Sequence, residues 1–269
     1  MQRLLVLLLA CLMVPVASSC GSSSSIRGTN VTQRSQDGLT LHATYRRQSS
    51  AEVLPTLILL HDGGPGNEQG TFEVAWGLLE NQGFNLLAVD FRSHGDSDIA
   101  GSPTDLETDP TGYPVDLLTW LEFLEDRADS GDPIARDRIG IIGLGVGASL
   151  AVAAIEKNQV DCAVAISPRE AQVDALRPGL PYRAVTGDDD DSAAGDDDDS
   201  ASEELDPITN VAFIDGTSAS SAADTQALYD RSEEPRSLLL VDGPQSGALI
   251  LQDFTDALAV VGAWCWDVL

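Results

Sequence analysis

The stretch RIGIIGLGVGASLAVAAIE, residues 138–156, decides the fold of this chain. An apolar run ends in glycines, and an alanine-rich run without proline follows directly. This order predicts a buried strand, a tight turn and a helix that starts near Val146. The spacing of Gly143, Gly145 and Ala148 fits the turn that binds dinucleotides in redox proteins. The same letters also fit the turn G-x-S-x-G, with Gly145 in place of the serine.

Strands and helices alternate on both sides of this stretch. Unbroken apolar runs predict further strands at residues 56–62, 84–91, 162–168, 210–217 and 236–243. Amphipathic runs predict helices at 71–83, 113–128, 222–231 and 251–269, and a hairpin is expected at 31–48 with its turn at Asp37 and Gly38. The chain is therefore expected to form an α/β fold, a mostly parallel sheet with helices on both faces.

Five segments with recognisable motifs follow one another along the chain. They are LLHDGGPG (59–66), VDFRSHGDSD (89–98), GLGVG (143–147), FIDGTSAS (213–220) and LLLVDGPQSGALIL (238–251). Together they resemble the α/β-hydrolase family, in its branch of dienelactone hydrolases and serine esterases. The resemblance covers residues 36–269 apart from an acidic insert at 187–206, and it implies one hydrolase-like domain. A dinucleotide-binding fold is the weaker alternative, because such a fold normally opens with its glycine turn.

The resemblance also implies where a catalytic triad would lie. The nucleophile, acid and histidine positions correspond to Gly145, Ala219 and Ser246, and none of these residues can play the required part. The three histidines of the chain are residues 42, 61 and 94, so none follows the glycine turn at residue 145. We therefore expect a catalytically inactive protein with a binding or scaffolding role. The alternative is an active esterase or peptidase with a non-standard site.

Backbone groups of the implied active site need no particular side chain. The resemblance places the oxyanion-hole donors near Asp62 and Gly63 and at Val146, so a small carbonyl or anionic ligand could still bind there. Alternatively, the glycines only let strand and helix pack closely. A weaker candidate site combines His61, His94 and Asp90, although such histidines more often orient loops. No cofactor and no metal site are predicted.

The overall charge limits the kinds of molecule that the protein can bind. The 269 residues carry a formal net charge of −28, which excludes a nucleic-acid partner because the field repels phosphate. Lys157 is the only lysine, a composition typical of a salty environment, although an ordinary habitat stays open. The insert at 187–206 is expected to be a disordered surface loop, and a calcium site there lacks the usual ligand spacing.

The first residues, MQRLLVLLLACLMVPVASSC, predict export. Residues 1–19 read as a signal peptide, and ASSC resembles the lipobox of bacterial lipoproteins with Cys20 as the lipidated residue. Residues 20–35 would then be the anchor cysteine and a Ser-rich tether to the membrane. Plain secretion or a periplasmic location is the alternative. Cys162 and Cys265 remain in the mature chain, and they either pair or stay as buried thiols.

Overall fold

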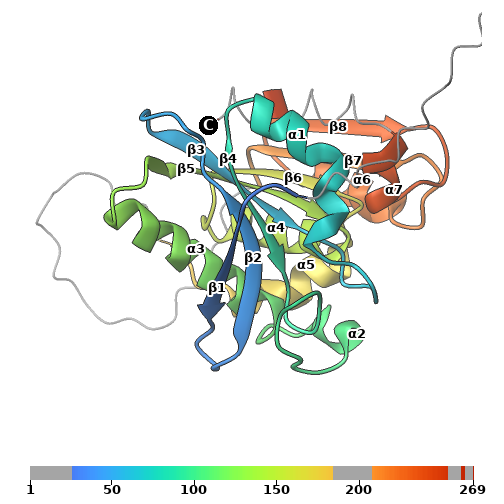
Figure 1. Cartoon of the computed structure of the whole chain (residues 1–269). Helices are drawn as coiled ribbons and strands as arrows, with labels where there is room; N and C mark the ends of the chain where they lie inside the picture. Colours follow the sequence, from blue (N-terminus) through green and yellow to red (C-terminus); the bar gives the residue numbers. More distant parts are fainter. Residues whose placement is uncertain (1–25, 184–207, 254–261, 264–268) are drawn as a thin grey trace, which may run out of the picture.

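One sheet of eight strands organises the protein. The computed structural model describes residues 26–183, 208–253, 262–263 and 269. The strand order is β1-β2-β4-β3-β5-β6-β7-β8 (Figure 1). The strands are β1 (Thr29–Arg34), β2 (Thr40–Arg46), β3 (Leu54–Leu60), β4 (Asn85–Asp90), β5 (Ile134–Leu144), β6 (Cys162–Ile166), β7 (Val211–Gly216) and β8 (Arg236–Val241).

The sheet is mostly parallel, as the sequence predicts. β1 and β2 form the expected antiparallel hairpin, and β2 also pairs antiparallel with β4. All other pairs are parallel, with Leu60 opposite Gly143 where β3 meets β5. The sheet begins at Thr29, before the predicted domain start at residue 36, because β1 pairs with β2 along its whole length. The residues of β1 therefore belong to the sheet and not to a tether.

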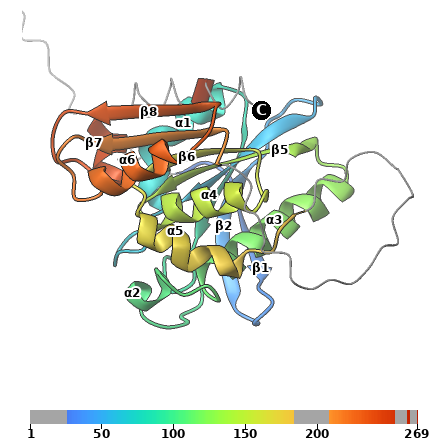
Figure 2. The same cartoon turned by 180° about the vertical axis from the view of Figure 1, so that it is seen from behind.

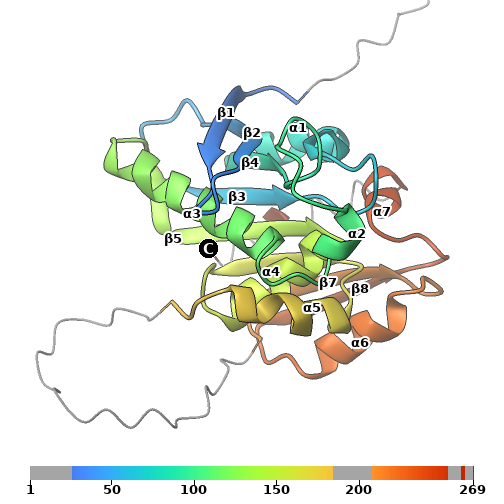
Figure 3. The same ribbon diagram turned by 90° about the horizontal axis from the view of Figure 1, so that it is seen from below.

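Helices cover both faces of the sheet. α1 (Glu73–Asn81) and α7 (Ala248–Asp253) pack on one face. α3 (Tyr113–Asp129), α4 (Val146–Glu156), α5 (Glu170–Leu176) and α6 (Ala222–Asp230) gather on the other, as Figures 2 and 3 show. The sequence did not predict α5, the short α2 (Pro103–Leu106) or the 3-10 helices at Gln69–Phe72 and Arg177–Gly179. Most of the predicted closing helix at 251–269 lies outside the described residues.

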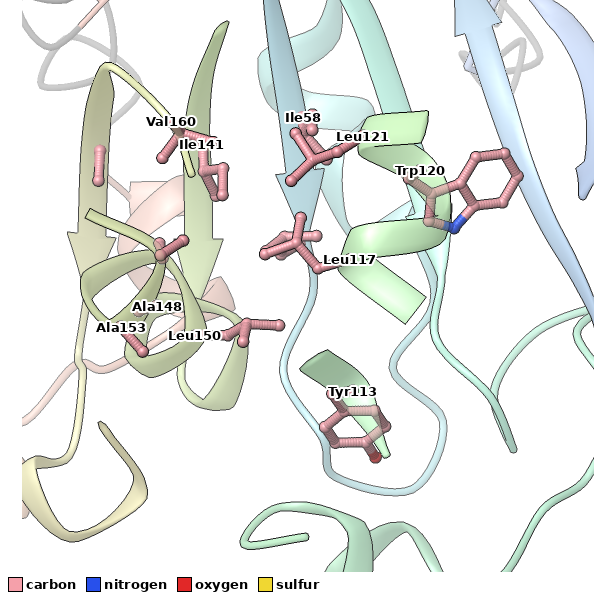
Figure 4. Close-up of a cluster of buried hydrophobic side chains, with 14 of the residues drawn as sticks. Ile58, Tyr113, Leu117, Trp120, Leu121, Ile141, Ala148, Leu150, Ala153 and Val160 are labelled. Atoms are coloured by element: carbon pink, nitrogen blue, oxygen red, sulfur yellow. The ribbon is translucent and has the colours of Figure 1, made fainter. Parts of the chain in front are cut away.

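Alternating side chains of the central strands supply two cores. Ile58 and Leu60 of β3 face α3 and α4, whereas Leu57 and Leu59 face α1. Figure 4 shows Leu117 and Leu121 of α3 directed toward β3, with Leu121 beside Ile58. This two-sided burial explains the unbroken apolar runs in the sequence.

Helix α4 lies unusually deep. Every one of its 11 residues is buried, and a Cβ added at Gly147 would lie 2.4 Å from the carbonyl oxygen of Leu60. The helix can therefore approach β3 only because this position is glycine. Close packing accounts for Gly147, as one of the sequence interpretations expected. The turn before α4 follows the fifth strand and not the first, so the topology does not support the dinucleotide interpretation.

Three predicted features fall outside the described residues: the signal and Cys20 in residues 1–25, the acidic insert, and Cys265. Cys162 is buried in β6. Within the described part of the chain, no helix has both the length and the apolar character that a membrane crossing requires.

Candidate functional site

The turn between β5 and α4 has the conformation of an elbow. Gly145 lies at its tip with φ 52° and ψ −114°, a backbone conformation that side-chain-bearing residues rarely adopt. Its N–H donates to the carbonyl of Ile166 at 2.9 Å, and its own carbonyl accepts the N–H of Ser149 at 3.0 Å. The turn is thus fixed to β6 on one side and starts α4 on the other.

The carboxylate of Asp62 occupies the space above this elbow. Asp62 follows β3, which neighbours β5 in the sheet. Its Oδ1 accepts hydrogen bonds from the N–H of Gly63 at 2.8 Å and the N–H of Val146 at 3.1 Å. A Cβ added at Gly145 would lie only 2.1 Å from the same Oδ1. Asp62 therefore fills the place where a side chain at position 145 would begin.

These are the two N–H groups that the resemblance assigned to an oxyanion hole. The structure does bring Gly63 and Val146 together, but both donors already bind the Asp62 carboxylate. The N-terminus of α4 adds a favourable dipole for this negative charge. The sequence pointed to Asp62 as a backbone donor or as a partner of the two histidines, and the contact of its carboxylate with the Val146 N–H was not predicted. The signal was the aspartate in HDGG, where the His-Gly-Gly-type turn of the family has no side chain.

A pocket of about 260 Å³ opens beside the elbow. It lies where the carboxyl ends of the parallel strands meet; Figure 3 shows their arrowheads directed toward one edge of the sheet. The residues that line it are Asp62, Gly64, Glu107, Gly145, Val146, Ser167, Arg169, Gln172, Ser221, Ser246 and Gly247. Gly145 and Ser246, two of the implied triad positions, therefore share this pocket. The third, Ala219, lies in the turn after β7 and does not line it.

Charges of both signs surround the pocket. Glu107 follows α2, and its Oε2 accepts a hydrogen bond from Gln172 Nε2 at 3.0 Å. Burial raises the pKa of Glu107, and the negative charge of Asp62 raises it further, while Arg169 opposes both effects. In the described part of the chain, the Arg169 guanidinium makes no hydrogen bond or ion pair. The pocket thus contains two carboxylates and one guanidinium, whose positive charge acts on Glu107.

Helix α4 is also held to the residues around the pocket. Ser149 is fully buried, and two acceptors lie within hydrogen-bond distance of its hydroxyl: Gly145 O at 3.1 Å and Gln172 Oε1 at 3.0 Å. The hydroxyl oxygen itself accepts the N–H of Arg169 at 2.9 Å. Ser149 therefore makes hydrogen bonds to residues that line the pocket but does not line the pocket itself.

His61 and His94 lie deep in the protein and outside the pocket. The Phe91 N–H donates to His61 Nε2 at 3.1 Å, so the proton sits on Nδ1, which donates to the Asp62 carbonyl at 2.7 Å. Burial lowers the pKa of His61 to about 3. His94 Nδ1 donates to Asn67 O at 3.0 Å, its Nε2 accepts from Tyr113, and burial lowers its pKa as well.

The weaker candidate site therefore consists of residues that already have partners. The rings of His61 and His94 are 4.8 Å apart, and Asp90 accepts hydrogen bonds from the N–H and side chain of Gln69. His61, His94 and Asp90 are all buried. Among the residues that the structure describes, no three His, Cys, Asp or Glu side chains are grouped as metal ligands. This arrangement orients the loops after β3 and β4.

A second polar cluster ties the ends of β6, β7 and β8 together. Ser167 has a positive φ of 57°, and its Oγ donates to Asp215 Oδ1 at 2.8 Å while accepting the Gly247 N–H at 2.9 Å. Asp215 is fully buried and also accepts from Thr225 Oγ1 at 2.7 Å. The sequence alone does not reveal this cluster, because its members come from separate segments.

Comparisons with known proteins agree with this architecture. A model of the alpha/beta hydrolase family matches residues 57–267. An esterase of Pyrococcus furiosus superposes with a TM-score of 0.64 at 21% identity, covering 90% of this chain and 93% of that one. A hyperthermophilic esterase of Pyrobaculum calidifontis gives 0.62 at 15% identity, covering 90% and 87%. A putative alpha/beta hydrolase of unknown function from Agrobacterium tumefaciens gives 0.60 at 15%, covering 88% and 94%. No curated protein sequence matches the chain.

Proposed function

Since this chain belongs to the alpha/beta hydrolase family, its elbow pocket is the place to look for function, and we propose that this pocket binds a small ligand without hydrolysing esters. The observation that carries the proposal is the position of the Asp62 carboxylate, with Oδ1 on the N–H groups of both Gly63 and Val146. Ester hydrolysis places a negatively charged oxygen on such donors in the transition state. Here a fixed negative charge already holds them.

The residues needed for attack are missing from the pocket as well. Gly145 offers no nucleophile, and the conformation of Asp62 leaves no room for one at that position. None of the three histidines of the chain lines the pocket. Without a base, a serine hydroxyl stays protonated and attacks poorly. These features support a binding role over the hydrolase chemistry that the family label suggests.

Two assays test this proposal. The purified protein is incubated with p-nitrophenyl acetate and butyrate, and in parallel with a fluorophosphonate probe that labels activated serines. We expect hydrolysis no faster than with an equal amount of heat-unfolded protein, and no labelled band. Enzyme-like turnover or stoichiometric labelling would overturn the proposal.

The alternative function, an esterase with a non-standard site, has one structural basis. Ser167 lines the pocket and donates to a buried carboxylate, that of Asp215. If the probe labels the protein, peptide mapping and the Ser167→Ala variant identify the residue. Label at Ser167 that disappears in the variant would establish this alternative.

The proposal also places the protein at the cell envelope, attached through a lipidated Cys20. It rests on the order of charge, apolar run and small residues in positions 1–20. Intact-mass spectrometry of the protein from a membrane fraction tests it. We expect the mass of a chain that starts at Cys20 and carries added acyl chains. The control is the Cys20→Ser variant, which has no thiol to acylate and should show no added acyl mass. An unmodified mature chain would instead indicate secretion or a periplasmic location.

A further inference from the structure

We propose that the ligand of the elbow pocket is a small zwitterion, a molecule such as an α-amino acid that carries an ammonium and a carboxylate on neighbouring atoms. This inference rests on the ligand-binding role proposed above and names the class of ligand. It follows from polar atoms of opposite charge that face the pocket and have no partner in the described part of the chain.

The negative side of the pocket consists of Asp62 and Glu107. Asp62 uses Oδ1 for both of its backbone hydrogen bonds, and its Oδ2 has no hydrogen bond to any residue that the structure describes. Oδ2 lies 4.0 Å from the point where a Cβ on Gly247 would stand. Glu107 uses Oε2 for Gln172, and its Oε1 likewise has no hydrogen bond among the described residues. Each carboxylate thus keeps a free oxygen. Since two like charges side by side repel, a group that is both positive and a hydrogen-bond donor fits here best.

The two carboxylates lie near each other, since the negative charge of Asp62 raises the pKa of Glu107. A Cβ on Gly63 would lie 2.8 Å from Glu107 Cγ and 3.1 Å from Glu107 Oε1. Glu107 therefore lies directly over the residue that follows Asp62. An ammonium group has three donors, enough to bond Asp62 Oδ2 and Glu107 Oε1 at the same time.

The lining also holds hydrogen-bond donors: the guanidinium of Arg169, which supplies the positive charge, and the hydroxyls of Ser221 and Ser246. The guanidinium of Arg169 has no ion-pair partner within the described residues, although the chain is rich in carboxylates. Ser221 is 2% exposed, and its Oγ is a buried hydroxyl without a partner in the same part of the structure. A buried hydroxyl left unbonded is costly, so this atom indicates a missing acceptor or donor. A ligand carboxylate supplies acceptors for such donors.

The size and lining of the pocket limit the ligand further. Its volume of about 260 Å³ is below the range of roughly 300–1,000 Å³ that is usual for drug-sized ligands. Val146 is the only aliphatic side chain in the lining, so the pocket offers little surface to an acyl chain. A small polar molecule fits this lining better than an ester with a long acyl group.

Isothermal titration calorimetry with three probes tests the charge pattern. L-alanine carries both charges, methylamine only the positive one and acetate only the negative one. We expect L-alanine to bind at least about 10-fold more tightly than either half, because each charge-assisted contact adds to affinity. Equal binding of methylamine or of acetate would overturn the inference, and so would the absence of binding by all three probes.

Variants on each side of the pocket make the test specific. We expect Glu107→Gln and Arg169→Gln each to weaken L-alanine binding about 10-fold or more. Glu125→Gln and Arg136→Gln remove one negative and one positive charge at exposed positions outside the pocket. These two control variants should bind L-alanine with unchanged affinity. Unchanged affinity in both pocket variants would overturn the inference. Hydrolysis in the ester assay would instead refute the proposal that the protein does not hydrolyse esters. The calorimetry would still test the class of ligand independently.

Discussion

The Asp62 carboxylate accepts the N–H of Val146 at 3.1 Å although the two residues are 84 positions apart in the chain. This contact joins the turn after β3 to the first residue of α4. It places a fixed negative charge on the two N–H groups that the family resemblance assigns to an oxyanion hole. The binding role that we propose for the neighbouring pocket rests on this contact.

Restoring a serine at the elbow is expected to destabilise the protein. In Gly145→Ser the new Cβ would lie 2.1 Å from Asp62 Oδ1, and the positive φ of 52° adds backbone strain. We expect the free energy of unfolding, measured in urea, to fall by about 2 kcal/mol or more. Asp62→Gly should relieve part of this loss, with a coupling of roughly 0.5–3 kcal/mol in the double-mutant cycle. Strictly additive effects would show that Asp62 does not fill the elbow.

Recovering hydrolysis requires the removal of Asp62. The triple variant Gly145→Ser, Ala219→Asp, Ser246→His restores the residue types of a triad but leaves the carboxylate on both N–H donors. We expect measurable hydrolysis of p-nitrophenyl acetate only when Asp62→Gly is added to these three changes. The matched control carries Asp62→Gly, Ala219→Asp and Ser246→His with Gly145 unchanged, and it should be silent. Equal activity with and without Asp62 would contradict the assignment of the oxyanion hole.

Acid should destabilise the protein through His61. Folded His61 stays neutral down to about pH 3, whereas in the unfolded chain it takes up a proton near its ordinary value of 6.5. Between these limits the unfolded state binds more protons, so this residue lowers the free energy of unfolding by up to about 1.4 kcal/mol per pH unit as the pH falls. Urea unfolding at pH 7.5, 6 and 5 measures the slope. The His61→Gln variant should show a smaller slope than the native protein, and identical slopes would refute the effect.

The loop after β4 depends on a buried ion pair. Arg92 is 3% exposed and binds the fully buried Asp116 at 2.8 Å. Arg92→Met would leave this carboxylate without its cation, so we expect a loss of about 3–5 kcal/mol. Adding Asp116→Asn removes the uncompensated charge and should recover part of the loss. The free energy of unfolding of both variants is measured in urea. A double variant that is less stable than Arg92→Met would contradict the claim that the uncompensated Asp116 carboxylate causes the loss.

Salt should stabilise this protein. A net charge of −28 makes the folded chain repel itself, and ions screen that repulsion over about 10 Å at 0.1 M salt and about 3 Å at 1 M. Because this screening saturates, we expect the urea midpoint to rise between 0.1 and about 1 M potassium chloride and to level off above it. A continued rise to 2 M would indicate a protein adapted to a salty environment, and a midpoint that does not rise at all would contradict the prediction.

The sequence by itself determined the eight strands, the longer helices between them, the glycine turn at residue 145 and the absence of a histidine after residue 94. The strands, helices and turn follow from local patterns of apolar residues and glycines, and the histidines are counted directly. Only the tertiary structure decided what the Asp62 side chain does, because its partner Val146 follows a strand that becomes a neighbour only when the sheet forms. The same holds for Glu107, Arg169 and Ser221, which come from separate loops and meet only where the parallel strands end.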